Sequence, residues 1–566
     1  MSTPAYAIGI DFGTESGRAL LLDLQSGEEA AVSEVRYPSA VIDRELPETG
    51  EELPADWALQ DPDDWVTVVE AAVPEVLSSA GVDKDEVAGV GVDFTSCTVL
   101  PVNRDGIPLC RLPEWRSRPH AWPKLWKHHA AQPVADRLNE VAGERGEEFL
   151  TRYGGKLSSE WYFPKLIELW LEDREVYDAA YGFIEATDWI VWQLTGNERR
   201  ATCTAGYKAC WSERDGLPSV EFFEAAYPGF SRPAEKLGMT FHQLGSPAGR
   251  LRAEVASRIG LDESTVVAVG NVDSFVSVPG AGIDQPGTYL MVVGTSICDL
   301  VIHPQEIRLP GITGVVRDGI LPGSYGYEAG QVAVGDMLAW FVEEIRSADG
   351  SVGDKDPYEA LEQAAARFLP GQTGLVAMDW WNGNRTILAD AGLTGVIAGL
   401  TLQTSQDQIY RALLESIAFG NRRIMDNFSE HGLDLGEIVA CGGIAEKSPL
   451  MMQLLADTSG RPVHIPASKQ IPARGAALFG AVAAGAFEDI EAAIAATRPE
   501  TARSYLPDRE AGAVYDAVYE VYRELHDTLG QSQAELLHKL KRIHVSAAAP
   551  VAAGDLPDSG ADRVDD

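Results

Sequence analysis

One pattern of apolar and polar positions occurs twice along the chain. In residues 7–24 an apolar run is interrupted by the polar stretch DFGTESGR and then resumes, which predicts a strand, a tight turn and a second strand. Residues 289–302 (YLMVVGTSICDLVI) repeat this order around Gly-Thr-Ser. The similarity indicates an internal duplication of one β-rich unit.

The rest of the chain alternates between strand and helix periodicity. Residues 111–260 have a mostly helical pattern rich in Trp and Tyr, which suits a pocket wall and a plain core equally. Residues 510–543 predict one charged helix. The other predicted strands cover residues 87–92, 99–102, 266–269, 437–440 and 462–465, and the other main helices cover 62–80, 408–428, 448–459 and a segment beginning near 474.

A chain of 566 residues is too long for one hydrophobic core, so two large domains with additions are expected. The predicted limits are residues 1–284 and 285–490, a helical extension over 491–546 and a disordered tail over 547–566. No apolar stretch reaches the length of a membrane span and no cleavable leader precedes the first strand, which indicates a cytoplasmic protein. The six cysteines are dispersed, as expected for reduced packing residues.

The chain is strongly acidic, with a net charge of −39. This charge argues against binding to a nucleic-acid backbone or to an anionic membrane surface. An anionic nucleotide would therefore need a pocket that is locally positive or rich in backbone amides.

The first polar turn carries groups that suit a phosphate. Gly13 permits backbone geometry that a side chain would block, Thr14 supplies a hydroxyl, and Arg18 can neutralise phosphate charge. Asp11 ends the first strand, where a hydrated Mg²⁺ could be held. The alternative is an ordinary hairpin with a polar turn.

Three motifs in order resemble the superfamily of sugar kinases, actin and Hsp70: DFGTESGR near residue 11, VGTS near 294 and CGG near 442. Within it, KLIELW at 165–170 and the Gly-containing turn and helix of 395–415 resemble the FGGY carbohydrate-kinase family. The resemblance covers about residues 5–545. It implies an α/β fold in which two actin-like (ribonuclease H-like) domains surround a catalytic cleft, with a helical Trp-rich insertion in the first domain.

Finer motifs are similar to the family members that phosphorylate L-ribulose. The resemblance therefore implies phosphorylation of L-ribulose at its 5-hydroxyl in arabinose catabolism, with ATP and Mg²⁺ and as a homodimer. The motifs are VDFTSCTVLPV, RYGGKLSSEW, EATDWIV, TAGYKACW, GTSICDL, YEAGQ and DWWNGNR.

Asp273 is the predicted general base for the attacking hydroxyl. It follows a buried strand, where a cleft opens in α/β architecture, and it matches the family's catalytic Asp. Its alternative role is a helix N-cap. The following Ser274-Phe275 departs from the small residue and His that relatives often carry.

The resemblance assigns the other site residues as well. Ser96, Lys208 and Glu328 are expected to bind the sugar with Asp273, and Asp93 either contacts the sugar or holds its loop. Asp11 is expected to hold Mg²⁺ through water. The nucleotide residues are Gly13, Thr14, Arg18, Gly294 and Thr295 at the phosphates, Gly442 and Gly443 at the adenosine, and Gly335 and Lys447 along the pocket.

Two alternatives stay open. One is another FGGY kinase, acting on D-ribulose, xylulose or a polyol such as ribitol. The other is an actin-like or Hsp70-like binding protein gated by a nucleotide, which would hydrolyse ATP slowly and without regard to sugar.

Overall fold

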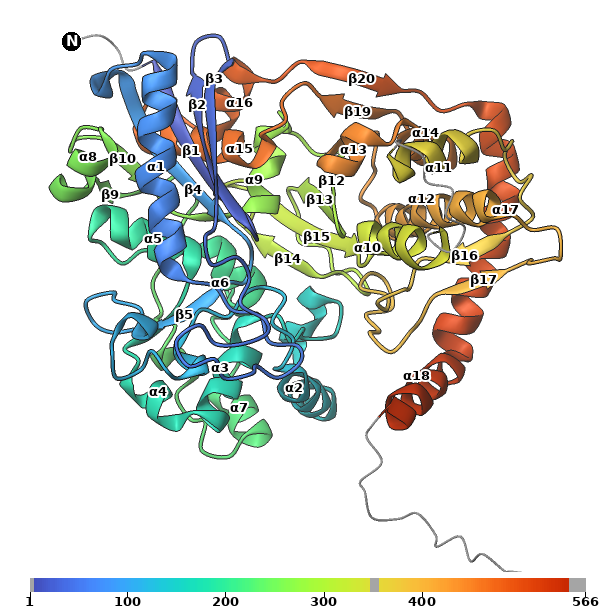
Figure 1. Ribbon diagram of the computed structural model, residues 1–566, viewed down its shortest axis with the longest axis horizontal. Coiled ribbons are helices and arrows are strands. Elements are labelled where there is room, and N and C mark those ends of the chain that lie inside the picture. The colour runs from blue at the N-terminus through green and yellow to red at the C-terminus, as the bar shows by residue number, and fades with distance from the viewer. Residues whose placement is uncertain (1–4, 347–355, 549–566) are drawn as a thin grey trace, which may run out of the picture.

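Two seven-stranded sheets form the framework of the protein. The structure, a computed structural model, describes residues 5–346 and 356–548 (Figure 1). The predicted tail, residues 547–566, lies almost wholly outside the described residues.

The first sheet has the strand order β3-β2-β1-β4-β10-β9, with β11 paired to β4. Both predicted hairpin strands are present in it, and β1 runs antiparallel to β2 and parallel to β4. Strands β1 and β4 are buried over nearly their whole length, as a parallel sheet covered on both faces requires. The strands are β1 (Tyr6–Phe12), β2 (Ser16–Asp23), β3 (Glu29–Arg36), β4 (Val87–Phe94), β9 (Pro247–Arg250), β10 (Val266–Ala268) and β11 (Asn271–Val272).

The second sheet has the order β14-β15-β13-β12-β18-β19-β20. Its hairpin β12–β13 and the parallel neighbour β18 repeat the arrangement of β1, β2 and β4. The strands are β12 (Thr288–Val293), β13 (Ile297–His303), β14 (Gly314–Arg317), β15 (Tyr325–Gln331), β18 (Glu437–Cys441), β19 (Val463–Pro466) and β20 (Thr501–Tyr505).

Helices cover both sheets. Helix α1 (Pro62–Ala80) packs on β2 and β3, and α12 (Gln406–Glu430) packs behind the second sheet. Helix α15 (Ile471–Ala483) lies against β1 and β4 of the first sheet, although in sequence it stands between β19 and β20 of the second sheet (Figure 1). A Cβ added at Gly9 would lie 1.7 Å from the Ala473 carbonyl oxygen, so only glycine permits this contact.

The Trp-rich region forms a helical layer with its own core, below the first sheet in Figure 1. The predicted strand at 99–102 is present as β5 (Val99–Val102), but it pairs only with β6 (Gly182–Glu185), outside the large sheets. The helices of this layer are α2 (Gln132–Arg145), α3 (Tyr162–Glu172), α4 (Arg174–Ala179) and α7 (Val220–Ala226). Helices α5 (Ala186–Thr195) and α6 (Thr202–Lys208) instead contribute to the core of the first sheet.

The prediction of one helix over residues 510–543 is wrong. Helix α17 (Arg509–Asp527) is separated from α18 (Ala534–Ala548) by a π-helical stretch, Thr528–Ser532. Gly530 lies in this stretch, and a Cβ there would meet Leu388 and Trp380 at 2.4 and 3.0 Å. Glycine weakens the helix, and the close packing of those side chains favours the interruption.

The cysteine prediction is confirmed, because all six thiols are free and five of them are buried. Among the described residues, the helices include none with the length and apolar character needed to cross a bilayer.

Candidate active site

Three aspartates meet at one edge of the first sheet. Asp11 near the end of β1 is paired in register with Asp93 on β4, and Asn271 of β11 is paired with Asp93 from the other side. Asp273 follows β11 directly and begins helix α9 (Asp273–Gly280). Since these strands are parallel, their carboxyl ends share one edge of the sheet, where α/β proteins bind ligands.

Burial dominates the electrostatics of these carboxyl groups. It raises the pKa of Asp273 to about 7, and the neighbouring Asp11 adds to the effect. Burial also raises the pKa of Asp93 well above its ordinary value, with further contributions from Asp11 and Asp273. Arg18 lies 3.6 Å from Asp11 (Nη1 to Oδ2) and opposes the rise in the pKa of Asp11 that burial causes.

The turn between β1 and β2 is held from outside by side chains. The Gln60 amide donates to the Thr14 carbonyl at 2.7 Å, and the Tyr37 hydroxyl donates to the Gly13 carbonyl at 3.0 Å. The Trp126 indole donates to the Thr14 hydroxyl at 3.1 Å. The sequence analysis missed Gln60 and Trp126, because neither stands in a motif and both are far from the turn in sequence.

Lys208 and Glu328 form an ion pair that joins the two halves of the molecule. The Lys208 Nζ at the end of α6 lies 3.0 and 3.2 Å from the carboxylate oxygens of Glu328 on β15. Both side chains are buried, and the charges of both act on Asp273. Phe275 contacts Tyr207 at a centroid distance of 4.2 Å, so the departure from the family pattern at this position builds an apolar wall beside Lys208.

Ser96 lies in the turn after β4. Its hydroxyl oxygen is buried and has no hydrogen-bond partner among the residues that the structure describes. A buried hydroxyl without a partner costs free energy, which a bound polar ligand would recover.

The second hairpin turn is joined to the double glycine. The Gly335 amide donates to the Thr295 carbonyl at 2.9 Å, and a Cβ at Gly335 would lie 2.9 Å from the Gly294 oxygen. Gly442 has a φ of 96°, and a Cβ there would lie 2.6 Å from the Val293 oxygen. Gly294, Thr295, Gly335 and Gly442 therefore form one group, with Gly443 beside it.

Lys447 lies one helical turn beyond Gly443. It ends the short helix α13 (Gly443–Lys447) and is exposed to solvent. The structure thus brings Asp11, Asp93, Asp273, Lys208 and Glu328 within electrostatic range of one another, whereas Lys447 stays at the surface.

Asp11 and Asp93 suit a small hard cation. Both carboxyl groups are buried, and within residues 5–346 and 356–548 neither oxygen of Asp93 has a hydrogen-bond partner. Mg²⁺ prefers oxygen ligands and is commonly held by one or two carboxylates together with water and substrate phosphates. The described part of the chain contains no cluster of three or more His, Cys, Asp or Glu residues suited to a metal.

Comparison with known proteins identifies the family. The N-terminal domain of the FGGY family of carbohydrate kinases matches residues 6–280, and its C-terminal domain matches residues 289–484. A ribulokinase from Anoxybacillus flavithermus is 49% identical over 96% of this chain and 98% of its own. The chain belongs to the FGGY family of carbohydrate kinases. A ribulokinase from Mycolicibacterium smegmatis is 44% identical over 96% of this chain and 97% of its own.

Solved structures show the same fold for this FGGY kinase. A ligand-bound xylulose kinase from Lactobacillus acidophilus aligns with a TM-score of 0.77 at 18% identity, over 94% of this chain and 99% of its own. A xylulose kinase from Rhodospirillum rubrum aligns with a TM-score of 0.75 at 23% identity, over 94% of this chain and 100% of its own. The predicted two-domain α/β fold is therefore confirmed.

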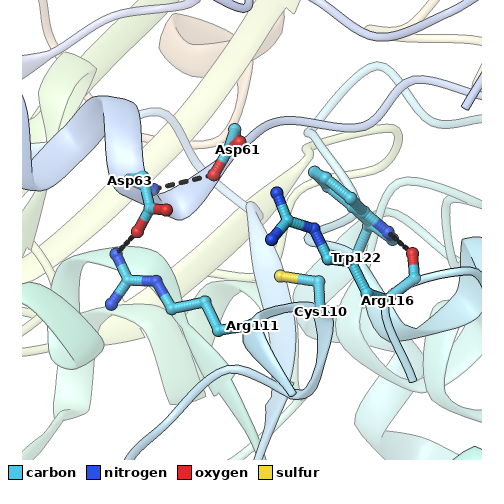
Figure 2. Close-up of a pocket in the computed structure, with 6 residues that line it drawn as sticks. All are labelled: Asp61, Asp63, Cys110, Arg111, Arg116 and Trp122. Atoms are coloured by element: carbon cyan, nitrogen blue, oxygen red, sulfur yellow. Dashed lines mark hydrogen bonds and ion pairs between the residues drawn. The ribbon is translucent and has the colours of Figure 1, made fainter. Parts of the chain in front are cut away.

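A pocket of about 220 Å³ lies at the start of α1 (Figure 2). Arg111 pairs there with Asp63, and Asp61 accepts a hydrogen bond from the Asp63 backbone amide, whereas Arg116 pairs with Glu48. The predicted site residues of this FGGY kinase are not among its lining residues, which are Asp61, Asp63, Cys110, Arg111, Arg116 and Trp122.

Proposed function

We propose that this FGGY kinase transfers the γ-phosphoryl group of ATP to the 5-hydroxyl of L-ribulose, giving L-ribulose 5-phosphate and ADP. The placement of Asp273 carries the proposal, because its half-buried carboxyl is within electrostatic range of Asp11 and of the Lys208–Glu328 pair. The ribulokinases that are up to 49% identical over nearly the whole chain support the choice of sugar.

Asp273 acts as the general base. One of its oxygens, Oδ1, accepts a hydrogen bond from the Ser274 amide at 2.6 Å, which leaves Oδ2 to take the proton of the sugar hydroxyl. The hydroxyl oxygen then attacks the γ-phosphorus, and the bond from that phosphorus to the bridging oxygen of ADP breaks. General base action of this kind contributes about 10²–10⁴-fold to the rate.

Lys208, Glu328 and Ser96 bind the sugar. The Lys208 ammonium has donors to spare beyond its contact with Glu328, while the Glu328 carboxylate and the unpartnered Ser96 hydroxyl can accept from sugar hydroxyls. Fixed donors and acceptors orient the 5-hydroxyl toward the phosphate, which is the main requirement of phosphoryl transfer.

The two hairpin turns hold the nucleotide phosphates. Thr14 keeps its hydroxyl hydrogen free for a phosphate because its oxygen accepts from Trp126. Asp11 would hold Mg²⁺, and the ion when bound would neutralise phosphate charge. The proposed nucleotide residues are Gly13, Thr14, Arg18, Gly294 and Thr295 for the phosphates, Gly442 and Gly443 for the adenosine, and Gly335 and Lys447 along the pocket.

We also propose that the protein is a cytoplasmic homodimer with domains over residues 1–284 and 285–490. The six free cysteines suit a reducing compartment. Leu536, Leu540 and Ile543 of α18 are more than half exposed and share one face of the helix, which a second copy would cover. Light scattering during size-exclusion chromatography tests the dimer.

The rate of ADP release with a panel of sugars tests the proposed activity. We expect L-ribulose to be the best substrate among L-ribulose, D-ribulose, D-xylulose, L-xylulose and ribitol. A higher kcat/KM with another sugar would assign a different member of the family. ATP hydrolysis that no sugar accelerates would instead favour a nucleotide-gated binding protein.

A pair of matched variants tests the general base. Asp273→Asn should lower sugar phosphorylation by about 10²–10⁴-fold while nucleotide binding is retained. Asp299→Asn is the control, because burial raises the pKa of Asp299 to about 7 as well, but this carboxyl accepts hydrogen bonds from Asn421. Near-normal turnover by Asp273→Asn would refute the mechanism.

A further inference from the structure

Glu185 is attached to the turn that carries Ser96. It is the last residue of β6 and pairs in register with Val99, the first residue of β5. The amide of the next residue, Ala186, donates to the Thr98 carbonyl at 2.8 Å. The backbone around Glu185 is therefore joined to the segment that follows Ser96 and Cys97.

The Glu185 carboxyl is buried and incompletely satisfied. Only 5% of the residue is exposed, and Oε1 has no hydrogen-bond partner within the described part of the chain. Although Glu185 precedes α5, its side chain does not cap that helix. Burial raises the pKa of Glu185 to about 7, which a hydrogen bond between the carboxyl and the Cys97 thiol opposes most, followed by the charges of Lys165 and Lys208.

The nearby cations do not neutralise this carboxyl directly. Lys165 donates to the carbonyls of Cys97 and Leu125, both at 2.8 Å. Lys208 is paired with Glu328. Glu185 thus lies within electrostatic range of two buried lysines while its own Oε1 stays without a donor.

Asp188, in the same EATD stretch, differs from Glu185 in its hydrogen bonds. Its carboxyl is also buried, but Oδ1 accepts a hydrogen bond from the Ala201 amide at 3.1 Å. Asp188 therefore has a backbone donor, whereas the Glu185 side chain has the Cys97 thiol as a partner and keeps Oε1 without a donor among the described residues. The unpartnered oxygen of Glu185 calls for a donor from elsewhere, since a buried acceptor without one is costly.

We propose that Glu185 accepts a hydrogen bond from a hydroxyl of the bound sugar and so determines which ketopentose is accepted. The Glu185 side chain bonds to Cys97, the neighbour of Ser96, and is within electrostatic range of Lys208, and both Ser96 and Lys208 belong to the proposed sugar site. A site with a buried acceptor rejects an analogue that lacks the matching hydroxyl, because the acceptor is then left unpaired. This inference rests on the proposed function.

A cycle of variants and deoxy sugars tests the contact. The 1-, 3- and 4-deoxy analogues of L-ribulose are compared with L-ribulose by kcat/KM, for the wild type and for Glu185→Met, which removes the acceptor at similar volume. The wild type should disfavour one analogue by at least about tenfold. In Glu185→Met this preference should fall to about twofold or less, while the other analogues keep their ratios.

Two further variants separate contact from folding. Glu185→Gln retains an acceptor oxygen and should keep most of the preference. Asp188→Asn should change thermal stability but leave the ratios as in the wild type. If Glu185→Met does not fold, Glu185→Asp takes its place, because it withdraws the carboxylate by one methylene and should also weaken the preference.

The outcomes distinguish this inference from the proposed function. Equal ratios in the wild type and in Glu185→Met, or in Glu185→Asp where it replaces that variant, would overturn the contact and leave Glu185 a structural residue. If the wild type does not phosphorylate L-ribulose, the proposed substrate is wrong, and the same cycle is run with deoxy analogues of the sugar that the panel selects. If Glu185→Met loses the preference for that sugar over one of its deoxy analogues, the result would still support Glu185 as a sugar contact.

Discussion

The indole Nε1 of Trp126 donates a hydrogen bond to the hydroxyl of Thr14 over a distance of 3.1 Å. The two residues are 112 positions apart, so the bond ties the Trp-rich part of the chain to the first hairpin turn. A hydroxyl that accepts from an indole keeps its own hydrogen available. The bond therefore directs the Thr14 hydroxyl hydrogen away from Trp126, where a phosphate could accept it.

Replacing Trp126 by Phe should weaken ATP binding. Phe keeps an aromatic ring but removes the N–H donor, and a lost hydrogen bond of about 0.5–1.5 kcal/mol corresponds to a rise in KM for ATP of about 2- to 12-fold. Trp122→Phe is the matched control, since the Trp122 indole donates to the Arg116 carbonyl at 2.9 Å, away from the hairpin. Equal changes in both variants would show that Trp126 does not position Thr14.

The rate should depend on pH through Asp273. A general base works only when deprotonated, and burial raises the pKa of Asp273 to about 7. The kcat/KM for the sugar should therefore fall about tenfold per pH unit below about pH 7 and level off above it. Initial rates at saturating ATP over the stable pH range measure this. A profile that stays flat below neutrality would contradict the assignment.

The variant Gly443→Ala should show whether the adenosine packs against this glycine. A Cβ at Gly443 meets no described atom within 4 Å, so Gly443→Ala should fold with an unchanged melting temperature. If the adenosine packs against this backbone, the added methyl group should lower ATP affinity at least about tenfold. Calorimetric titration with a nonhydrolysable ATP analogue measures this affinity.

Gly442 is the reference for that experiment. It has a φ of 96°, and a Cβ there would lie 2.6 Å from the Val293 oxygen, so Gly442→Ala should lower stability as well as nucleotide affinity. Unchanged affinity in Gly443→Ala would place the adenosine elsewhere.

Variants of the Lys208–Glu328 pair should change stability and activity independently of each other. Lys208→Met leaves the buried Glu328 carboxylate without its cation, and breaking a buried pair in this way costs about 3–5 kcal/mol of unfolding free energy. Adding Glu328→Gln removes the uncompensated charge, so the double variant should regain most of that stability. It should not regain sugar phosphorylation, because both side chains bind the sugar. Urea unfolding and initial rates measure the two properties, and recovery of activity in the double variant would exclude these residues from the sugar site.

Local patterns in the sequence were enough to predict the elements that carry the site. The hairpin β1–β2, its repeat β12–β13, the strand β4 and helix α1 all lie close to their predicted positions, because alternation, glycine turns and helix caps act over a few residues. The interruption near Gly530 was missed, since it depends on Trp380 and Leu388, which are remote in sequence.

Contacts between segments that are distant in sequence could not be predicted from local patterns. No local pattern relates Trp126 to Thr14, Lys208 to Glu328, or Glu185 to Val99. Each of these contacts depends on how the helical layer is placed against the sheets. The same holds for α15, whose small residues predict close packing without telling which sheet receives them.

The sequence by itself therefore determined the two polar hairpin turns, the aspartates that end the strands and the membership of a kinase family. The tertiary structure alone decided that Asp11, Asp93 and Asp273 share one buried edge, that Lys208 pairs with Glu328 across the two halves, and that Glu185 keeps an unpartnered oxygen among the described residues. The physical reason is the distance along the chain over which each kind of interaction acts. Backbone preferences act between neighbours in sequence, whereas burial, charge and hydrogen bonding depend on what lies nearby in space.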